Sequence, residues 1–242
     1  MRLDKFLVEV GVGSRTVVKK LLRQKKVTVN AKVETSAKIL IDPDKDEIRY
    51  DGTLLVYQAF VYYMLHKPAG VISATQDKNH QTVLDCLDDQ ARQRGVFPVG
   101  RLDRDTEGLL LLTNNGQLAH AMLSPKKHVD KVYEAHVLGI MTRSDQEAFE
   151  AGIKLSDHEC LPAQLEIIAV DEAEQTSLVK IRIQEGKFHQ VKRMVKACGK
   201  EVTYLKRLSM GPLSLDQALE KGQWRPLQDQ EMRSLEVFGV SL

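Results

Sequence analysis

The chain has 242 residues, of which 43% are hydrophobic, and a formal net charge of +2, a composition typical of a protein that buries a sizeable core. No apolar run approaches the length of a membrane span, and the first residues lack the organisation of a signal peptide, so we expect a cytoplasmic protein without a membrane segment. Cys86, Cys160 and Cys198 are far apart and no two histidines have an HExxH arrangement, so we expect neither a disulfide framework nor a metal site.

Two short helices and a strand are expected at the start of the chain. Residues 3–10 carry apolar side chains at helical spacing, Gly11 and Gly13 end that helix, and Ser14 suits the N-cap of the next one. The second helix has an apolar face (Val17, Val18, Leu21 and Leu22) and an opposite basic face (Arg15, Lys19, Lys20 and Arg23). Residues 27–30 follow as a short strand.

The basic face of the second helix belongs to a longer stretch without acidic residues. Residues 14–32 contain seven bases and no acid, and residues 180–207 contain nine bases and two acids. Such a face is often only a solvated surface. Two basic stretches on a nearly neutral chain also indicate local binding of a polyanion such as RNA.

A change in composition predicts a domain boundary near residue 59. A polar turn at residues 41–47 and the pair Asp51-Gly52 precede it, and both are typical of connections between elements. We therefore expect two domains, residues 1–58 and residues 59–242.

Strands alternate with helices in the second domain. The expected strands span residues 61–65, 109–113, 131–138 and 178–183. The run Ser144–Glu147 predicts a capping box that opens a helix, and Asn114-Asn115-Gly116 predicts a turn. A last helix follows Lys187 and ends at Gly199, with Val191, Met194, Val195 and Cys198 facing inward. The pattern predicts an α+β fold with a mixed, largely antiparallel sheet flanked by helices.

The segment Val99–Gly108 places three acids and two arginines in a tight loop ahead of an apolar strand. Loops held by a rigid strand often carry catalytic groups, although such a loop can also be a structural set of ion pairs. Asp103 and Asp105 have the D-x-D spacing of some metal-dependent sugar transferases. No further carboxylate cluster completes a metal shell, which disfavours that interpretation.

Longer motifs give this loop a context. The string GRLDRDTEGLLLLTNNG at residues 100–116 resembles the central motif of the pseudouridine synthases. Lys131–Glu134 (KVYE) and Glu185–Met194 (EGKFHQVKRM) resemble the second and third motifs, in the expected order. Met64–Gly70 and Gly222–Leu227 resemble the opening and closing segments of the same family. Three long motifs in register are far more specific than any one of them.

The N-terminal part resembles the S-four RNA-binding module of ribosomal proteins. The matching stretches are Arg2–Phe6, Ser14-Arg15 and Val27–Asn30. The sequence departs from the module at Lys25 or Lys26 and at Ala31, where glycines are usual.

This module followed by this catalytic domain is the layout of the RsuA-like pseudouridine synthases, and the resemblance covers nearly the whole chain. The segment Asp77–Leu84 and the form HQVKRM are most similar to the member that acts on small-subunit rRNA.

The resemblance implies a catalytic role for three residues. Asp103 would be the catalytic carboxylate, Tyr133 would lie against the target base, and Lys192 would be the cation beside Asp103. A buried carboxylate needs a nearby cation to stay ionised, and Arg193 is the adjacent candidate on the same helix. The alternatives are a sheet-packing role for Tyr133 and an RNA-backbone contact for Lys192.

Arg101 would fill the gap that a flipped uridine leaves in the RNA, unless it forms a salt bridge with Asp105 or Glu107. The other expected RNA contacts are Arg15, Lys19, Lys20, Arg23, Lys187, His189, Gln190 and Arg193. The reaction detaches, rotates and rejoins one base without a redox step or a group donor, so we expect no cofactor.

The function implied by the resemblance is isomerisation of one uridine to pseudouridine in ribosomal RNA, with uridine 516 of 16S rRNA as the expected site. The partner would be ribosomal RNA or the assembling small subunit, and we expect a monomer. Two alternatives remain: an RNA-binding ribosome-assembly factor without catalysis, and a large-subunit enzyme of the same family.

Overall fold

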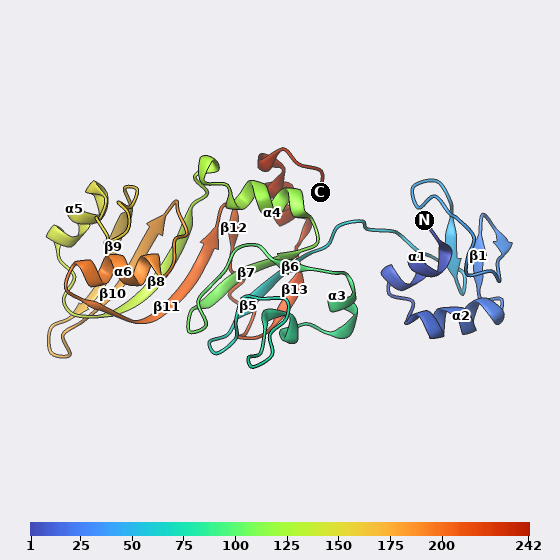
Figure 1. Ribbon diagram of the computed structural model, residues 1–242, viewed down its shortest axis with the longest axis horizontal. Helices are drawn as coiled ribbons and strands as arrows, with labels where there is room; N and C mark the ends of the chain where they lie inside the picture. The colour runs from blue at the N-terminus through green and yellow to red at the C-terminus, as the bar shows by residue number, and fades with distance from the viewer. The chain divides into compact units, whose positions relative to one another are not determined.

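The computed structural model describes residues 1–242, and the chain divides into two compact units (Figure 1). The first unit consists of Met1–Val61 and Asp89–Arg94, and the second consists of Tyr62–Asp88 and Gly95–Leu242. Nothing in the sequence indicates that residues 89–94 pack with the first unit. A domain boundary near residue 59 therefore stays a proposal. The structure adds that the segment Asp89–Arg94 groups with the first unit.

The first unit is built from two helices and a small antiparallel sheet. The helices are α1 (Leu3–Glu9) and α2 (Arg15–Arg23), and α3 (Asp89–Gln93) joins them from the distant segment. The sheet has the order β2 (Lys32–Val33), β1 (Val27–Val29), β3 (Ile48–Tyr50) and β4 (Thr53–Leu54). A single apolar core joins helices and sheet, and its buried residues are Leu3, Phe6, Leu7, Val18, Leu22, Val27, Ile41 and Ile48.

The helix α2 follows the expected pattern with one difference. Ser14 is its N-cap, and the Ser14 hydroxyl accepts a hydrogen bond from the amide of Val17 at 3.4 Å. Val18 and Leu22 are fully buried, whereas Val17 is 45% exposed, so the buried face is narrower than the sequence suggested. Lys25 and Ala31 adopt left-handed backbone conformations (φ 59° and 63°), so the turns survive without the glycines that are usual there.

The second unit is organised around one large sheet (Figure 1). Its strands run in the order β13 (Trp224–Pro226), β5 (Tyr62–Lys67), β7 (Glu107–Thr113), β11 (Glu201–Met210), β8 (Lys131–Leu138), β10 (Thr176–Ile183) and β9 (Gln164–Asp171). The short strands β6 (Phe97–Pro98) and β12 (Leu213–Ser214) pair with β7 and β11. Only the β7–β11 pair is parallel, which confirms the prediction of a mixed, largely antiparallel sheet.

The helices of the second unit are α4 (Gly116–Leu123), α5 (Arg143–Ala151), α6 (Gln190–Ala197) and α7 (Asp229–Ser234). Short 3-10 turns span Val83–Cys86, Pro125–Lys127 and Leu235–Phe238. Helices α5 and α6 pack against β9 and β11, respectively. None of the helices is both long and apolar enough to cross a lipid bilayer.

Two helix starts differ from the sequence-based expectation. The N-cap of α5 is Thr142, which forms a capping box with Asp145, and the expected cap Ser144 lies inside the helix. Asn115, expected in a turn, is the N-cap of α4. Its side-chain oxygen accepts hydrogen bonds from the amides of Gln117 and Leu118. Capping residues and turn residues are of the same types, so sequence alone could not separate the two.

The contact between β7 and β11 explains one glycine of the central motif. Gly108 has φ +107°, and a Cβ atom there would lie 2.2 Å from the carbonyl oxygen of Arg207 on β11. Only glycine lets the two backbones approach this closely. The contact joins β7, which follows the acidic loop, to the part of the sheet that carries β8 and α6.

Candidate active site

The acidic loop of residues 99–106 joins β6 to β7, and two side chains from outside the loop anchor it. The buried Lys67, at the end of β5, donates from Nζ to the carbonyls of Arg104 (3.3 Å) and Thr106 (2.8 Å). The Ser73 hydroxyl donates to the carbonyl of Leu102 at 2.9 Å and accepts from its amide at 3.0 Å. The backbone on both sides of Asp103 is therefore fixed by hydrogen bonds.

Asp103 lies between two basic side chains from the third motif. The Nζ atom of Lys192 is 3.5 Å from Oδ2 of Asp103, and Nε2 of His189 is 3.6 Å from Oδ1. The Asp103 side chain is 27% exposed, so a substrate can still reach its oxygens. The loop before β7 and helix α6 thus bring together a carboxylate and a lysine that are far apart in the sequence.

Lys192 is shared between two carboxylates. Its Nζ donates a shorter hydrogen bond, 2.6 Å, to Oδ1 of Asp105. Burial alone would raise the pKa of Asp105, but the hydrogen bond and charge of Lys192 outweigh burial and hold that pKa below its ordinary value. The sequence suggested Lys192 as the partner of Asp103 alone, and the structure shows that Asp105 holds the ammonium in place beside it.

Tyr133 faces the same small pocket as Asp103. Strand β8 alternates strictly, so Lys131, Tyr133, Ala135 and Val137 all point to its buried side. The pocket has a volume of about 50 Å³, and its lining includes Asp103, Thr106, Tyr133 and Val191. The Thr106 hydroxyl is buried there without a hydrogen-bond partner. A flat ring, a carboxylate and an unpaired hydroxyl are thus grouped in one hollow.

Arg101 stands at the rim of this pocket with a free guanidinium group. Its side chain is exposed and makes no hydrogen bond or ion pair with the protein. The two acids that could have bound it have other partners: Asp105 binds Lys192, and Glu107 binds Lys221 and Tyr204. The salt-bridge alternative for Arg101 is therefore absent from this structure.

The remaining candidate RNA contacts of the second unit lie in the turn before α6 and in α6 itself, and their side chains differ in what they contact. Lys187 and His189 line the pocket. Gln190 also lines the pocket, but its side chain is buried and binds Glu185 and the amide of Lys187. Arg193 forms an ion pair with Asp157 and donates to the carbonyl of Phe188, so it points away from Asp103. Gln190 and Arg193 thus both hold the turn, and of the two only Gln190 lines the pocket.

The basic face of α2 in the first unit is open to solvent. Arg15, Lys19, Lys20 and Arg23 are all exposed, and none of these side chains forms an ion pair. Phosphate groups could therefore bind them without first displacing a carboxylate.

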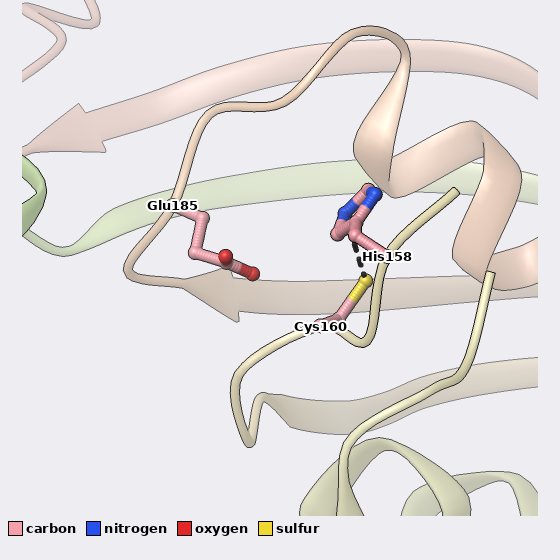
Figure 2. Close-up of side chains that lie close together, drawn as sticks. All are labelled: His158, Cys160 and Glu185. Carbon is pink, nitrogen blue, oxygen red and sulfur yellow. Dashed lines mark hydrogen bonds between the residues drawn. The ribbon is translucent and has the colours of Figure 1, made fainter.

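One side-chain cluster beside the active-site turn could offer ligands to a metal ion (Figure 2). His158, Cys160 and Glu185 have ligand atoms within 4.8 Å of one another. Burial, followed by the charge of Glu185, raises the pKa of the Cys160 thiol, which opposes the thiolate that a metal requires. The Glu185 carboxylate already accepts hydrogen bonds from Leu161 and Gln190, so the cluster serves to support the turn before α6.

Sequence reasoning does not identify three residues that position the site. Lys67 belongs only to the family's opening strand and turn, Ser73 belongs to no motif, and Asp105 stands out only through its D-x-D spacing. The one signal in the sequence is a lysine two residues after the predicted strand at residues 61–65, a position at which a charge needs a buried partner.

The comparisons with known proteins agree with this geometry. The family described as RNA pseudouridylate synthase matches residues 61–197, and the S4 domain matches residues 1–48. Among solved structures, one described as a pseudouridylate synthase matches with a TM-score of 0.67 and 35% sequence identity, covering 97% of this chain and 99% of that chain.

Three curated relatives match over nearly their whole length. An uncharacterised RNA pseudouridine synthase of Bacillus subtilis, YtzG, is 46% identical, over 97% of this chain and 98% of that protein. The ribosomal large subunit pseudouridine synthase B of Bacillus subtilis is 38% identical, over 98% and 96%. The ribosomal small subunit pseudouridine synthase A of Escherichia coli is 37% identical, over 97% and 100%.

Proposed function

The chain belongs to the RNA pseudouridine synthase family and carries an S4 domain, and from this premise we propose that it isomerises one uridine of small-subunit ribosomal RNA with Asp103 as its catalytic carboxylate. The observation that carries the proposal is the position of Asp103, which shares one pocket with Tyr133 and has the ammonium of Lys192 at 3.5 Å.

The reaction needs the groups that this pocket contains. The bond between the anomeric carbon of the sugar and a ring nitrogen breaks, the uracil rotates, and a new bond forms through a ring carbon. A carboxylate either attacks the sugar or assists removal of a proton from it. Asp103 is the carboxylate of the pocket, and the ammonium of Lys192 lies 3.5 Å from one of its oxygens.

Tyr133 and Arg101 complete the proposed roles. The ring of Tyr133 provides a flat surface for the detached uracil, and its hydroxyl can move a proton. Arg101 has no protein partner and stands at the pocket rim, where a guanidinium can occupy the space that the flipped uridine leaves in the RNA. Burial of the reacting base also excludes water, which would otherwise capture the sugar and leave an abasic site.

We propose 16S rRNA as the target, with uridine 516 as the modified position and the free RNA or the assembling subunit as the partner. The support is the small-subunit relative at 37% identity and the similarity of Asp77–Leu84 and HQVKRM to that type. A large-subunit target is the second candidate, because the large-subunit relative is 38% identical over an equal length. We further propose that the protein acts as a monomer.

Release of tritium from uridine labelled at the carbon that forms the new bond tests the proposal. Transcripts of 16S and 23S rRNA, each labelled in this way, are incubated with the protein in the presence of a chelator. We expect release from the 16S transcript, at most one tritium per molecule, and none from the 23S transcript. Release from the 23S transcript alone would move the target to the large subunit, and binding without release from either would favour a non-catalytic assembly factor.

A further inference from the structure

Phe188, in the turn before α6, is the only exposed aromatic side chain of the chain. It is 74% exposed, whereas the other aromatic residues are buried or half-buried. Its neighbours in the chain, Lys187 and His189, both line the catalytic pocket. An exposed aromatic ring contributes no buried area to the stability of the fold. Its position beside the pocket therefore indicates a binding role.

One face of the Phe188 ring is already covered. The rings of Phe188 and His189 are stacked, with centroids 3.8 Å apart and an angle of 18° between their planes. This spacing is close to the roughly 3.4 Å rise between stacked bases in a nucleic acid. Nε2 of His189 is also 3.6 Å from Oδ1 of Asp103. His189 therefore contacts both Asp103 and the phenyl ring, and Phe188 stays exposed to solvent.

The backbone around Phe188 is held in this conformation. His189 adopts a left-handed conformation (φ 49°) directly before α6. The carbonyl of Phe188 accepts a hydrogen bond from Arg193, and the amide of Lys187 donates to the side chain of Gln190 at 3.0 Å. The platform is thus formed before any ligand binds, which lowers the entropy cost of binding.

We propose that the stacked pair of Phe188 and His189 is a docking platform for one unpaired nucleobase that flanks the target uridine. This inference rests on the proposed action on RNA. An aromatic face accepts any base, and stacking of single-stranded bases on aromatic side chains is a sequence-tolerant source of affinity. Lys187, exposed next to the ring, adds a positive charge for the adjoining phosphate. A purine offers more stacking area than a pyrimidine, so a purine beside the target uridine binds best.

The proposal predicts that substitutions of Phe188 act on binding and spare the chemical step. Phe188→Leu keeps an apolar side chain but removes the aromatic face, whereas Phe188→Tyr and Phe188→Trp keep an aromatic ring. The control is Leu138→Ala, which truncates an exposed apolar side chain elsewhere. Since one base–aromatic stack contributes about 1–3 kcal/mol of binding free energy, Phe188→Leu should raise the apparent KM for labelled RNA about 5- to 160-fold. Its kcat should stay within about twofold, and the ring-keeping variants and the control should match the wild type.

A second readout observes the stack directly. A short single-stranded RNA carries uridine with a neighbouring 2-aminopurine, whose fluorescence is quenched when it stacks. The wild type should quench it, and Phe188→Leu should not. Equal quenching and equal RNA affinity in wild type and Phe188→Leu would overturn the platform. Wild-type protein that quenches the probe but releases no tritium from either rRNA would contradict the proposed reaction and leave the platform standing.

Discussion

Single substitutions test the role of Lys192, which lies beside two carboxylates of the site, most directly. Lys192 lies 2.6 Å from Asp105 and 3.5 Å from Asp103, so one positive charge is placed beside both carboxylates. Lys192→Met removes that charge from the site, and a carboxylate that loses a neighbouring cation takes up a proton more readily. We expect the acidic limb of the pH–activity profile to move to higher pH. Lys192→Arg should restore much of the activity.

The control for this prediction is Lys196→Met, which removes an exposed lysine one turn later on the same helix. It should leave the acidic limb unchanged. If Lys192 contacted only phosphate, Lys192→Met would leave the acidic limb in place and lower the salt dependence of RNA binding by about one unit.

Lys67 shows how a buried residue positions the acidic loop. Burial lowers the pKa of Lys67 to about 8, from an ordinary value near 10.5. Between these two pH values the folded state has released the proton while the unfolded state retains it, so stability rises with pH across that window. The free energy of unfolding of wild type relative to Lys67→Met should therefore increase by about 1–3 kcal/mol between pH 7.5 and pH 10.

Urea unfolding at the two pH values measures this difference. The buried Lys131, whose pKa burial also lowers to about 8, is present in both proteins, so its effect cancels. A constant difference would show that Lys67 does not titrate in this window. Lys67→Met should also lower kcat, because the carbonyls of Arg104 and Thr106, which follow Asp103 in the loop, would lose the hydrogen bonds from Lys67.

At the scale of elements, the close approach of β7 and β11 sets the distance between the acidic loop and the rest of the site. Gly108→Ala should destabilise the protein by more than about 3 kcal/mol, because the new Cβ would collide with the backbone of Arg207 at a positive φ. Gly116→Ala is the matched control, since Gly116 lies in α4 with open space around it. It should be neutral or stabilising by up to about 1 kcal/mol. Denaturant midpoints of the two variants check both expectations, and equal midpoints would contradict this account of Gly108.

The elements also show what the sequence could predict. Strand β8 has the expected limits, residues 131–138, because strict alternation of buried and exposed side chains is a strong signal. Strand β9 is not predicted, since most of its residues are exposed and its pattern does not alternate clearly. The predicted cap of α5 lies two residues too late, because Thr142 and Ser144 are both capping residue types.

Within the site, the motifs identify the residues but not their contacts. The family motif places Asp103, Tyr133 and Lys192 in the chain, and the fold brings all three to the pocket region. That Lys192 binds Asp105 as well, that Gln190 turns inward and that Phe188 stays open depend on how α6 and the turn before it pack in the fold. Sequence spacing contains no information about those contacts.

At the scale of the whole molecule, the two units are expected to divide binding from chemistry. Replacing Arg15, Lys19, Lys20 and Arg23 together by glutamine removes the open basic face of α2 without touching the pocket. RNA affinity should fall, and the slope of log K against log salt should decrease by about 0.7 to 0.9 for each phosphate that the variant no longer neutralises. The value of kcat at saturating RNA should stay near that of wild type. An unchanged salt slope would contradict the RNA-binding role of this face.

The central claim is that Asp103 performs the isomerisation. The most direct measurement compares tritium release by wild type, Asp103→Asn and Asp105→Asn on the same labelled rRNA, at RNA concentrations above the dissociation constant of each. Asparagine is nearly isosteric, so folding and RNA affinity should be retained in both variants. Asp103→Asn should release no tritium above background, and Asp105→Asn should keep substantial turnover, because Lys192 can still reach Asp103. Substantial release by Asp103→Asn would contradict the assignment.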